Sequence, residues 1–157
     1  MKLVTLGDVC KFQKGFNFKA SKQRSQGLPI LKIKNIQNGK IITEGLTFFN
    51  PSEFKENLSK YQIKSNDIVI AMSGNTTGKV GINDTNTIFF LNTATGRIDP
   101  DETKINRRWL YHFLLSKRED FFNLAECATQ PNLYFSQIEK VELLLPSLSE
   151  QNSKDIR

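Results

Sequence analysis

A dense group of basic side chains occupies the first third of the chain, and closely spaced cations bind phosphate. No Asp or Glu lies between residues 9 and 43. The basic residues of this segment are Lys11, Lys14, Lys19, Lys22, Arg24, Lys32, Lys34 and Lys40. The whole chain holds 22 Lys and Arg against 16 Asp and Glu, so its net charge of +6 arises from this segment. Such a segment predicts contact with nucleic-acid phosphates, although a solubilising surface has the same composition.

Residues 11–28 combine cations with amides and aromatic rings, and their lack of periodicity predicts a long basic loop. Cations suit phosphates, amides and Arg suit base edges, and rings suit anchoring or base contact. On this basis we predict DNA contacts from the loop residues Lys14, Asn17, Lys19, Lys22, Gln23 and Arg24. The alternative is a flexible loop whose Phe16 and Phe18 fold back into the core.

The next candidates lie on a predicted strand. Apolar residues at positions 30, 31, 33 and 36 predict that strand, with Lys32 and Lys34 on one of its faces. Lys binds phosphate as a point charge and Asn reads adenine through two hydrogen bonds, so Lys32, Lys34 and Asn35 are candidate DNA contacts. An exposed strand face whose lysines discourage edge pairing explains the same residues.

Residues 74–79, Gly-Asn-Thr-Thr-Gly-Lys, place short polar side chains between two glycines. A phosphate-binding P-loop needs four residues between its glycines and a Ser or Thr after its Lys, and Val80 breaks that pattern here. We therefore predict a tight turn between two strands. Polar donors on such a turn suit phosphates or base edges, so Asn75, Thr76 and Lys79 are further candidates, beside a purely structural role.

Near the end of the chain, Gln130, Asn132 and Tyr134 either read bases or satisfy a turn, since Asn and Pro favour turns. Nothing in the sequence predicts catalysis or metal binding. Cys10 and Cys127 lack zinc-ligand spacing, and the single His112 cannot complete a site. We therefore expect no catalytic residue, no metal and no cofactor.

The elements that position these residues follow from periodicity and turn signals. A helical turn is predicted near Leu6, and the Asn-Gly pair before Lys40 predicts a hairpin whose returning strand covers residues 40–49. A short helix is predicted from Pro51, capped by Asn50. Further strands are predicted over the ranges 67–72, 79–82 and 88–92, with 95–98 extending the last of them.

The longest predicted helix covers residues 106–124, where apolar side chains partly follow a helical stripe. Together these elements predict an α+β fold, with a twisted, partly antiparallel sheet and a few flanking helices. No run of about 18 apolar residues occurs, so we expect no membrane contact and a cytoplasmic location.

Four segments in a fixed order resemble a known family. They are residues 6–10 (Leu-Gly-Asp-Val-Cys), 29–39, 67–74 with 77–81, and the closing stretch 128–151. In the closing stretch a polar Gln-Pro-Asn turn precedes an apolar strand over 141–145, Pro146 and a helix start. This order resembles the target recognition domain of the specificity subunit of type I restriction-modification systems.

The resemblance implies a non-enzymatic reader of double-stranded DNA. It implies methyltransferase (modification) and restriction subunits as partners, and these bring the S-adenosylmethionine, ATP and magnesium chemistry. It also implies a recognition domain over residues 1–148 and the start of a truncated spacer helix over 149–157. Such a chain would pair with a second copy of itself or with another half-subunit. The alternative is a module that docks on a methyltransferase subunit through helix 106–124 without reading DNA.

Overall fold

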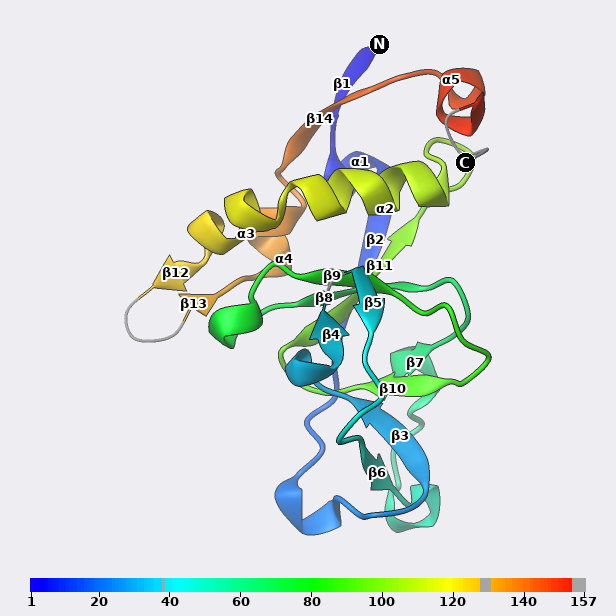
Figure 1. The fold of residues 1–157 in the computed structure, drawn as a ribbon, viewed down its shortest axis with the longest axis vertical. Helices are drawn as coiled ribbons and strands as arrows, with labels where there is room; N and C mark the ends of the chain where they lie inside the picture. The colour runs from blue at the N-terminus through cyan, green and yellow to red at the C-terminus, as the bar shows by residue number, and fades with distance from the viewer. Residues whose placement is uncertain (38, 128–130, 154–157) are drawn as a thin grey trace.

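A mixed sheet forms the centre of the fold, in a computed structural model that describes residues 1–37, 39–127 and 131–153 (Figure 1). Within those residues, six strands join this sheet. In spatial order they are β2 (Cys10–Lys14), β11 (Thr95–Pro100), β8 (Ile68–Ala71), β9 (Val80–Ile82), β5 (Gly39–Ile41) and β4 (Ile36–Gln37). Neighbouring strands run antiparallel, except that β5 and β9 are parallel. The strands predicted over 67–72 and 79–82 are thereby confirmed as β8 and β9.

A second sheet lies in the lower half of Figure 1. Its strands, in spatial order, are β6 (Thr47–Phe49), β3 (Leu28–Leu31), β10 (Phe89–Leu91) and β7 (Gln62–Ile63). Only β3 and β10 are parallel among these pairs of described strands. The prediction that residues 95–98 extend β10 is wrong. The chain turns through Ala94, whose φ is 66°, and β11 then enters the other sheet.

Two short ribbons complete the strands of the described chain. β1 (Lys2–Thr5) pairs antiparallel with β14 (Glu142–Leu145), which joins the two ends of the domain. β12 (Glu126–Cys127) pairs antiparallel with β13 (Pro131–Asn132). Both ribbons lie outside the two larger sheets, and the first half of β1 is exposed.

The described helices lie in the upper half of Figure 1. They are α1 (Leu6–Val9), α2 (Arg107–Ser116), α3 (Arg118–Leu124), α4 (Phe135–Ile138) and α5 (Leu148–Ser153). The single helix predicted over 106–124 is wrong, because Lys117 ends α2 and begins α3 with a non-helical ψ of 10°. Both helices still bury side chains in one core, such as Leu114 and Phe121. The mixture of helices and partly antiparallel sheets confirms the α+β class.

Short 3-10 helices form many of the turns. They are η1 (Ala20–Lys22), η2 (Ile33–Asn35), η3 (Pro51–Glu53), η4 (Ser59–Tyr61) and η5 (Gly74–Thr76). The predicted cap before Pro51 is confirmed, because the side chain of Asn50 accepts a hydrogen bond from the backbone N of Ser52 at 3.0 Å. The helical turn predicted near Leu6 is confirmed as α1.

The first third of the chain departs furthest from prediction. The strand predicted from residue 30 to 36 ends at Leu31, because the side-chain oxygen of Asn35 captures the backbone N of Lys32 at 3.0 Å and holds the chain in η2. The loop was predicted to begin at residue 11, but residues 11–14 belong to strand β2. The hairpin is confirmed by the pairing of Gln37 with Lys40, and Asn38 lies outside the described residues. Its predicted return strand is split between β5 and β6.

The core is organised around β8, which is buried on both faces. Ile68 and Ile70 pack with α1, α2, α3 and β14, whereas Val69 and Ala71 face the second sheet. This double burial explains why β8 is a continuous apolar run rather than an alternating one. A strand held in this way is a rigid support for the turns at its two ends.

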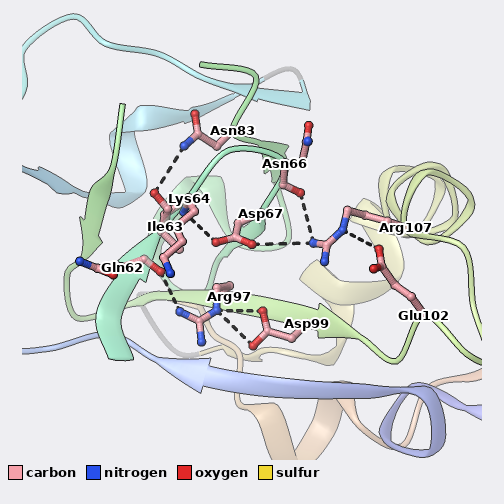
Figure 2. Close-up of polar contacts among 10 residues, drawn as sticks. All are labelled: Gln62, Ile63, Lys64, Asn66, Asp67, Asn83, Arg97, Asp99, Glu102 and Arg107. Carbon is pink, nitrogen blue, oxygen red and sulfur yellow. Dashed lines mark hydrogen bonds and ion pairs between the residues drawn. The ribbon is translucent and has the colours of Figure 1, made fainter. Parts of the chain in front are cut away.

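Two arginines tie the lower sheet to the upper one (Figure 2). Arg97 of β11 donates to the backbone O of Gln62 at 2.7 Å. Arg107 of α2 donates to the backbone O of Asn66 at 3.2 Å and to the carboxylate of Glu102 at 3.0 Å. The bonds to Gln62 and Asn66 end on backbone carbonyls, so they fix the path of the chain that enters β8.

Candidate nucleic-acid interface

The turn between β8 and β9 is held by its own backbone, which leaves its tip accessible. Gly74 and Gly78 have φ angles of 74° and 87°, which favour glycine. The hydroxyl of Thr77 is buried and donates to the backbone O of Gly74 at 2.6 Å. Asn75 is exposed at the tip, whereas Thr76 is half-buried and its hydroxyl is enclosed, which leaves it poorly placed to read bases. The predicted tight turn is confirmed, and its polar tip is presented by a rigid strand.

Two segments that are distant in sequence flank this turn. Ser73 forms an isolated antiparallel bridge with Asn132 of β13. On the other side, a Cβ at Gly74 would lie 3.4 Å from the Cδ1 of Ile33, so η2 packs directly against η5. The exposed or half-buried polar residues that meet here, which we call the turn face, are Lys34, Asn75, Thr76 and Asn132. The structure therefore gathers candidates from three separate segments.

Tyr134 lies two residues beyond the turn face and is 50% exposed. Its backbone N donates to the side-chain oxygen of Gln137 at 3.0 Å, which fixes the start of α4. The phenol is thereby left outside the core, at a place where it can contact a partner. The neighbouring candidate Gln130 lies outside the described residues.

Asn35 is 1% exposed, so it is unsuited to base reading. Its Oδ1 accepts from the backbone N of Lys32, and its Nδ2 donates to the backbone O of Ile42 at 3.0 Å. A side chain bonded to the backbone in this way supports the turn, and we do not count Asn35 among the DNA contacts. Lys32 is half-buried and its ammonium donates to the side chain of Gln23 at 2.8 Å. Desolvation, with a smaller contribution from Lys34, lowers the pKa of Lys32.

The basic arm, residues 14–24, lies lower on the same long side of Figure 1 as η2 and η5. Its rings fold inward: Phe18 is 3% exposed and lies 4.8 Å from Phe49, between ring centroids. Phe16 packs on the same cluster, 5.0 Å from Phe18. Apolar burial therefore places Phe18 in the core, with Phe16 packed against it. The alternative, in which they fold back, is confirmed.

The polar residues of the basic arm divide into two groups. Lys22 donates to the backbone O of Glu53 at 3.0 Å, and Arg24 forms an ion pair with the carboxylate of Glu53. Both therefore hold the arm to η3. Lys14, Asn17 and Lys19 are exposed, and these three are the arm residues most open to a partner.

Lys79 follows the turn and is half-buried. It lines a cavity with Gly39, Val80, Leu115 and Arg118, between the sheet and the junction of α2 with α3. Arg118 was not singled out from the sequence. It precedes Glu119 and Asp120, and such mixed charge predicts only a solvated helix face.

No catalytic or metal centre is evident in the part of the chain that the structure describes. No group of three or more His, Cys, Asp and Glu side chains there could hold a metal ion. Burial raises the pKa of the Cys10 thiol to about 12, which keeps this sulfur protonated and unreactive. The side chain of Cys127 lies outside the described residues. None of the described helices has the length and apolar character needed to cross a membrane.

The described residues combine an α+β fold with polar turns along one side. A family model described as the type I restriction modification DNA specificity domain matches residues 1–154. The chain therefore belongs to this family, which confirms the resemblance drawn from the sequence.

Relatives with assigned names agree with this family. The chain is 29% identical over 158 residues to the specificity subunit of the type I restriction enzyme MjaVIII of Methanocaldococcus jannaschii, covering 97% of this chain and 37% of that protein. It is 30% identical over 153 residues to the putative type I restriction enzyme specificity subunit S.HindORF215P of Haemophilus influenzae, covering 96% and 37%. The chain thus spans about a third of the length of these relatives.

Solved structures share the fold. The HsdS subunit of Thermoanaerobacter tengcongensis matches with a TM-score of 0.71 and 17% identity, over 97% of this chain and 34% of that one. The type I restriction-modification S subunit of M. genitalium matches with a TM-score of 0.65 and 17% identity, over 97% and 36%.

Proposed function

We propose that this chain binds double-stranded DNA in a sequence-dependent way, as a target-recognition part of a type I specificity subunit. The observation that carries the proposal is the convergence of η2, η5 and β13 on one turn face, with Asn75 and Asn132 exposed. Amide side chains read base edges through paired hydrogen bonds, and a rigid turn can present them to a groove. Exposed arm cations such as Lys14 and Lys19 contact phosphates and set the register.

The partners follow from the family. We infer that methyltransferase and restriction subunits supply the chemistry, and that this chain directs them to one half of a divided site. The chain itself would transfer no methyl group when it is incubated with DNA and S-adenosylmethionine. A second copy, or another half-subunit, would read the other half of the site. A DNA partner places the chain in the cytoplasm.

The domain boundary near residue 148 remains a proposal. Helix α5 begins at Leu148, and its Gln151 is fully buried. The side chain of Gln151 donates to the backbone O of Pro146 at 2.8 Å and accepts from the backbone N of Asn106 at 2.6 Å. These bonds support a spacer helix that starts in a fixed orientation against α2.

Selection from a random duplex library, at near-physiological salt, tests the function. The chain is used alone and then with a cognate methyltransferase subunit. A short enriched motif from the chain alone would establish a self-sufficient reader, and enrichment only with the partner would show a reader that depends on assembly. Absence of enrichment in both cases would reject DNA reading and favour the docking module.

A further inference from the structure

A cleft with two cations lies behind the turn face and was not expected from the sequence. The first of two adjoining cavities is lined by Gly39, Lys79, Val80, Leu115 and Arg118. The second is lined by Asn75, Arg118, Glu119, Phe122 and Asn123. Arg118 lines both, so the two cavities adjoin at this side chain, between the η5 turn and the start of α3, and we call the pair the cleft.

Arg118 is held in place by this turn. Its Nη2 donates to the backbone O of Asn75 at 3.0 Å, and its guanidinium lies 5.7 Å from the ring centroid of Phe122. A Cβ at Gly78 would lie 2.8 Å from the backbone O of Arg118, so only a glycine lets the turn approach α3 this closely. The guanidinium is therefore pre-positioned rather than free in solvent.

Donors remain unused at this junction. Among the described residues, Arg118 Nε and Thr76 Oγ1 are buried without a hydrogen-bond partner. Leaving such a group unsatisfied costs about 1–3 kcal/mol, so native folds retain few of them without a reason. Neither Lys79 nor Arg118 has an acidic side chain within ion-pair distance in the part of the chain that the structure describes.

We propose that this cleft holds one phosphodiester group of the bound duplex, contacted by Arg118 and Lys79. The inference rests on the proposed function and adds a phosphate site beside the base-reading turn. A guanidinium gives planar, directed donors, and an ammonium gives a point charge, which together suit phosphate oxygens. Since Glu119 lines the same cleft, the cations exceed the acid by one charge, which matches the single charge of a phosphodiester rather than that of free phosphate.

The position of the cleft explains what the contact would do. Asn75 belongs both to the cleft and to the turn face, so a phosphate held by Arg118 would lie next to the base that Asn75 reads. Phosphate contacts of this kind fix register and carry no sequence information themselves. Loss of the cleft should therefore weaken binding to all duplexes alike.

Duplex binding measured over a range of salt concentrations tests the proposal, with the variants Lys79→Gln and Arg118→Gln. Lys79→Gln is the cleaner variant, because the Lys79 side chain makes no hydrogen bond or ion pair with described residues. The control is Lys64→Gln, an equal charge change at an exposed site at the opposite end of β8. Circular dichroism and thermal unfolding verify that each variant folds.

The expected result is a salt slope that is smaller by about one for each cleft variant and unchanged for the control. Affinity should fall by roughly threefold to tenfold at low salt, equally for preferred and altered duplexes. Between about 50 and about 200 mM salt, the ratio of wild-type to variant affinity should then shrink by roughly threefold.

Two outcomes would overturn the proposed phosphate site while leaving the proposed function intact. One is a wild-type slope in both cleft variants, with duplex binding preserved. The other is saturable binding of inorganic phosphate that Lys79→Gln abolishes, while the duplex slope stays the same. If the wild-type chain binds no duplex, with or without a methyltransferase subunit, the cleft and the proposed function both fail.

Discussion

The turn face and the basic arm both hold predicted DNA contacts, but they are supported in different ways. At the turn face, backbone bonds and a buried Thr77 hydroxyl hold the shape, and the side chains of Asn75 and Asn132 stay exposed. In the arm, Lys22 and Arg24 are themselves the supports, because both bind Glu53. Charge alone therefore does not identify the reading residues, since part of a basic segment can serve its own fold.

Removing a ring from the arm tests this comparison with the largest expected effect. Phe18→Ala should lower the free energy of unfolding by about 3–5 kcal/mol, because it empties a site packed by Phe49 and Phe54. Urea unfolding measures the change. Leu144→Ala, at a side chain that is 59% exposed, is the control and should shift stability by less than about 0.5 kcal/mol. A loss below about 1 kcal/mol for Phe18→Ala would mean that the rings do not hold the arm.

A glycine exchange tests the support of the turn face. Gly78→Ala should cost about 2–3 kcal/mol, because it combines a left-handed φ with a contact against the backbone of Arg118. Gly45→Ala is the matched control: its φ is 67°, but the nearest atom is the flexible Lys34 ammonium at 3.4 Å. The control should cost about 1 kcal/mol. Thermal unfolding compares them, and equal losses would show that the turn does not depend on its approach to α3.

Side-chain removal at the turn face should change recognition more than stability. Asn75→Ala or Asn132→Ala should weaken binding to the preferred duplex by about 1–2 kcal/mol and relax the preference at one base pair. Unfolding should shift by less than about 0.5 kcal/mol, since both side chains are exposed. Titration against duplexes altered one base pair at a time measures the preference. A uniform loss for every duplex would reassign the residue to phosphate contact.

The smallest expected effect comes from releasing Arg24. Glu53→Gln breaks an exposed ion pair and should change stability by less than about 1 kcal/mol. The freed guanidinium should then increase the salt slope of duplex binding by up to about one. Glu56→Gln removes the same charge from an exposed residue close by and serves as the control. If both variants behave alike, Arg24 is not withheld from DNA by Glu53.

The sequence predicted elements whose signals are local. The apolar run of β8 and the two glycines after it determined a strand and a turn, and Asn50 with Pro51 determined a cap. The alternation of Lys32 and Lys34 was misleading, because the Asn35 side chain replaces the ladder bonds that a strand would need. The division into two sheets could not be predicted from the sequence, since it depends on pairings between distant segments, such as β3 with β10.

For the candidate site too, the sequence indicated residue types but not which residues meet in space. Asn75, Thr76 and Asn132 were selected by residue type, but their meeting depends on the bridge from Ser73 to Asn132, which only tertiary structure provides. Arg118 was missed because the two residues after it are acidic, whereas its neighbours in space are Asn75 and Lys79.

The pairing of β1 with β14 has a consequence for how the domain is made. Lys2 lies opposite Leu145, so β1 can form its ladder hydrogen bonds only once β14 is available. Closing so long a loop is entropically costly and slows folding relative to local contacts. During synthesis the N-terminal strand stays unpaired until residue 145 has left the ribosome. A nascent chain shorter than this therefore has an open edge available to chaperones or to aggregation.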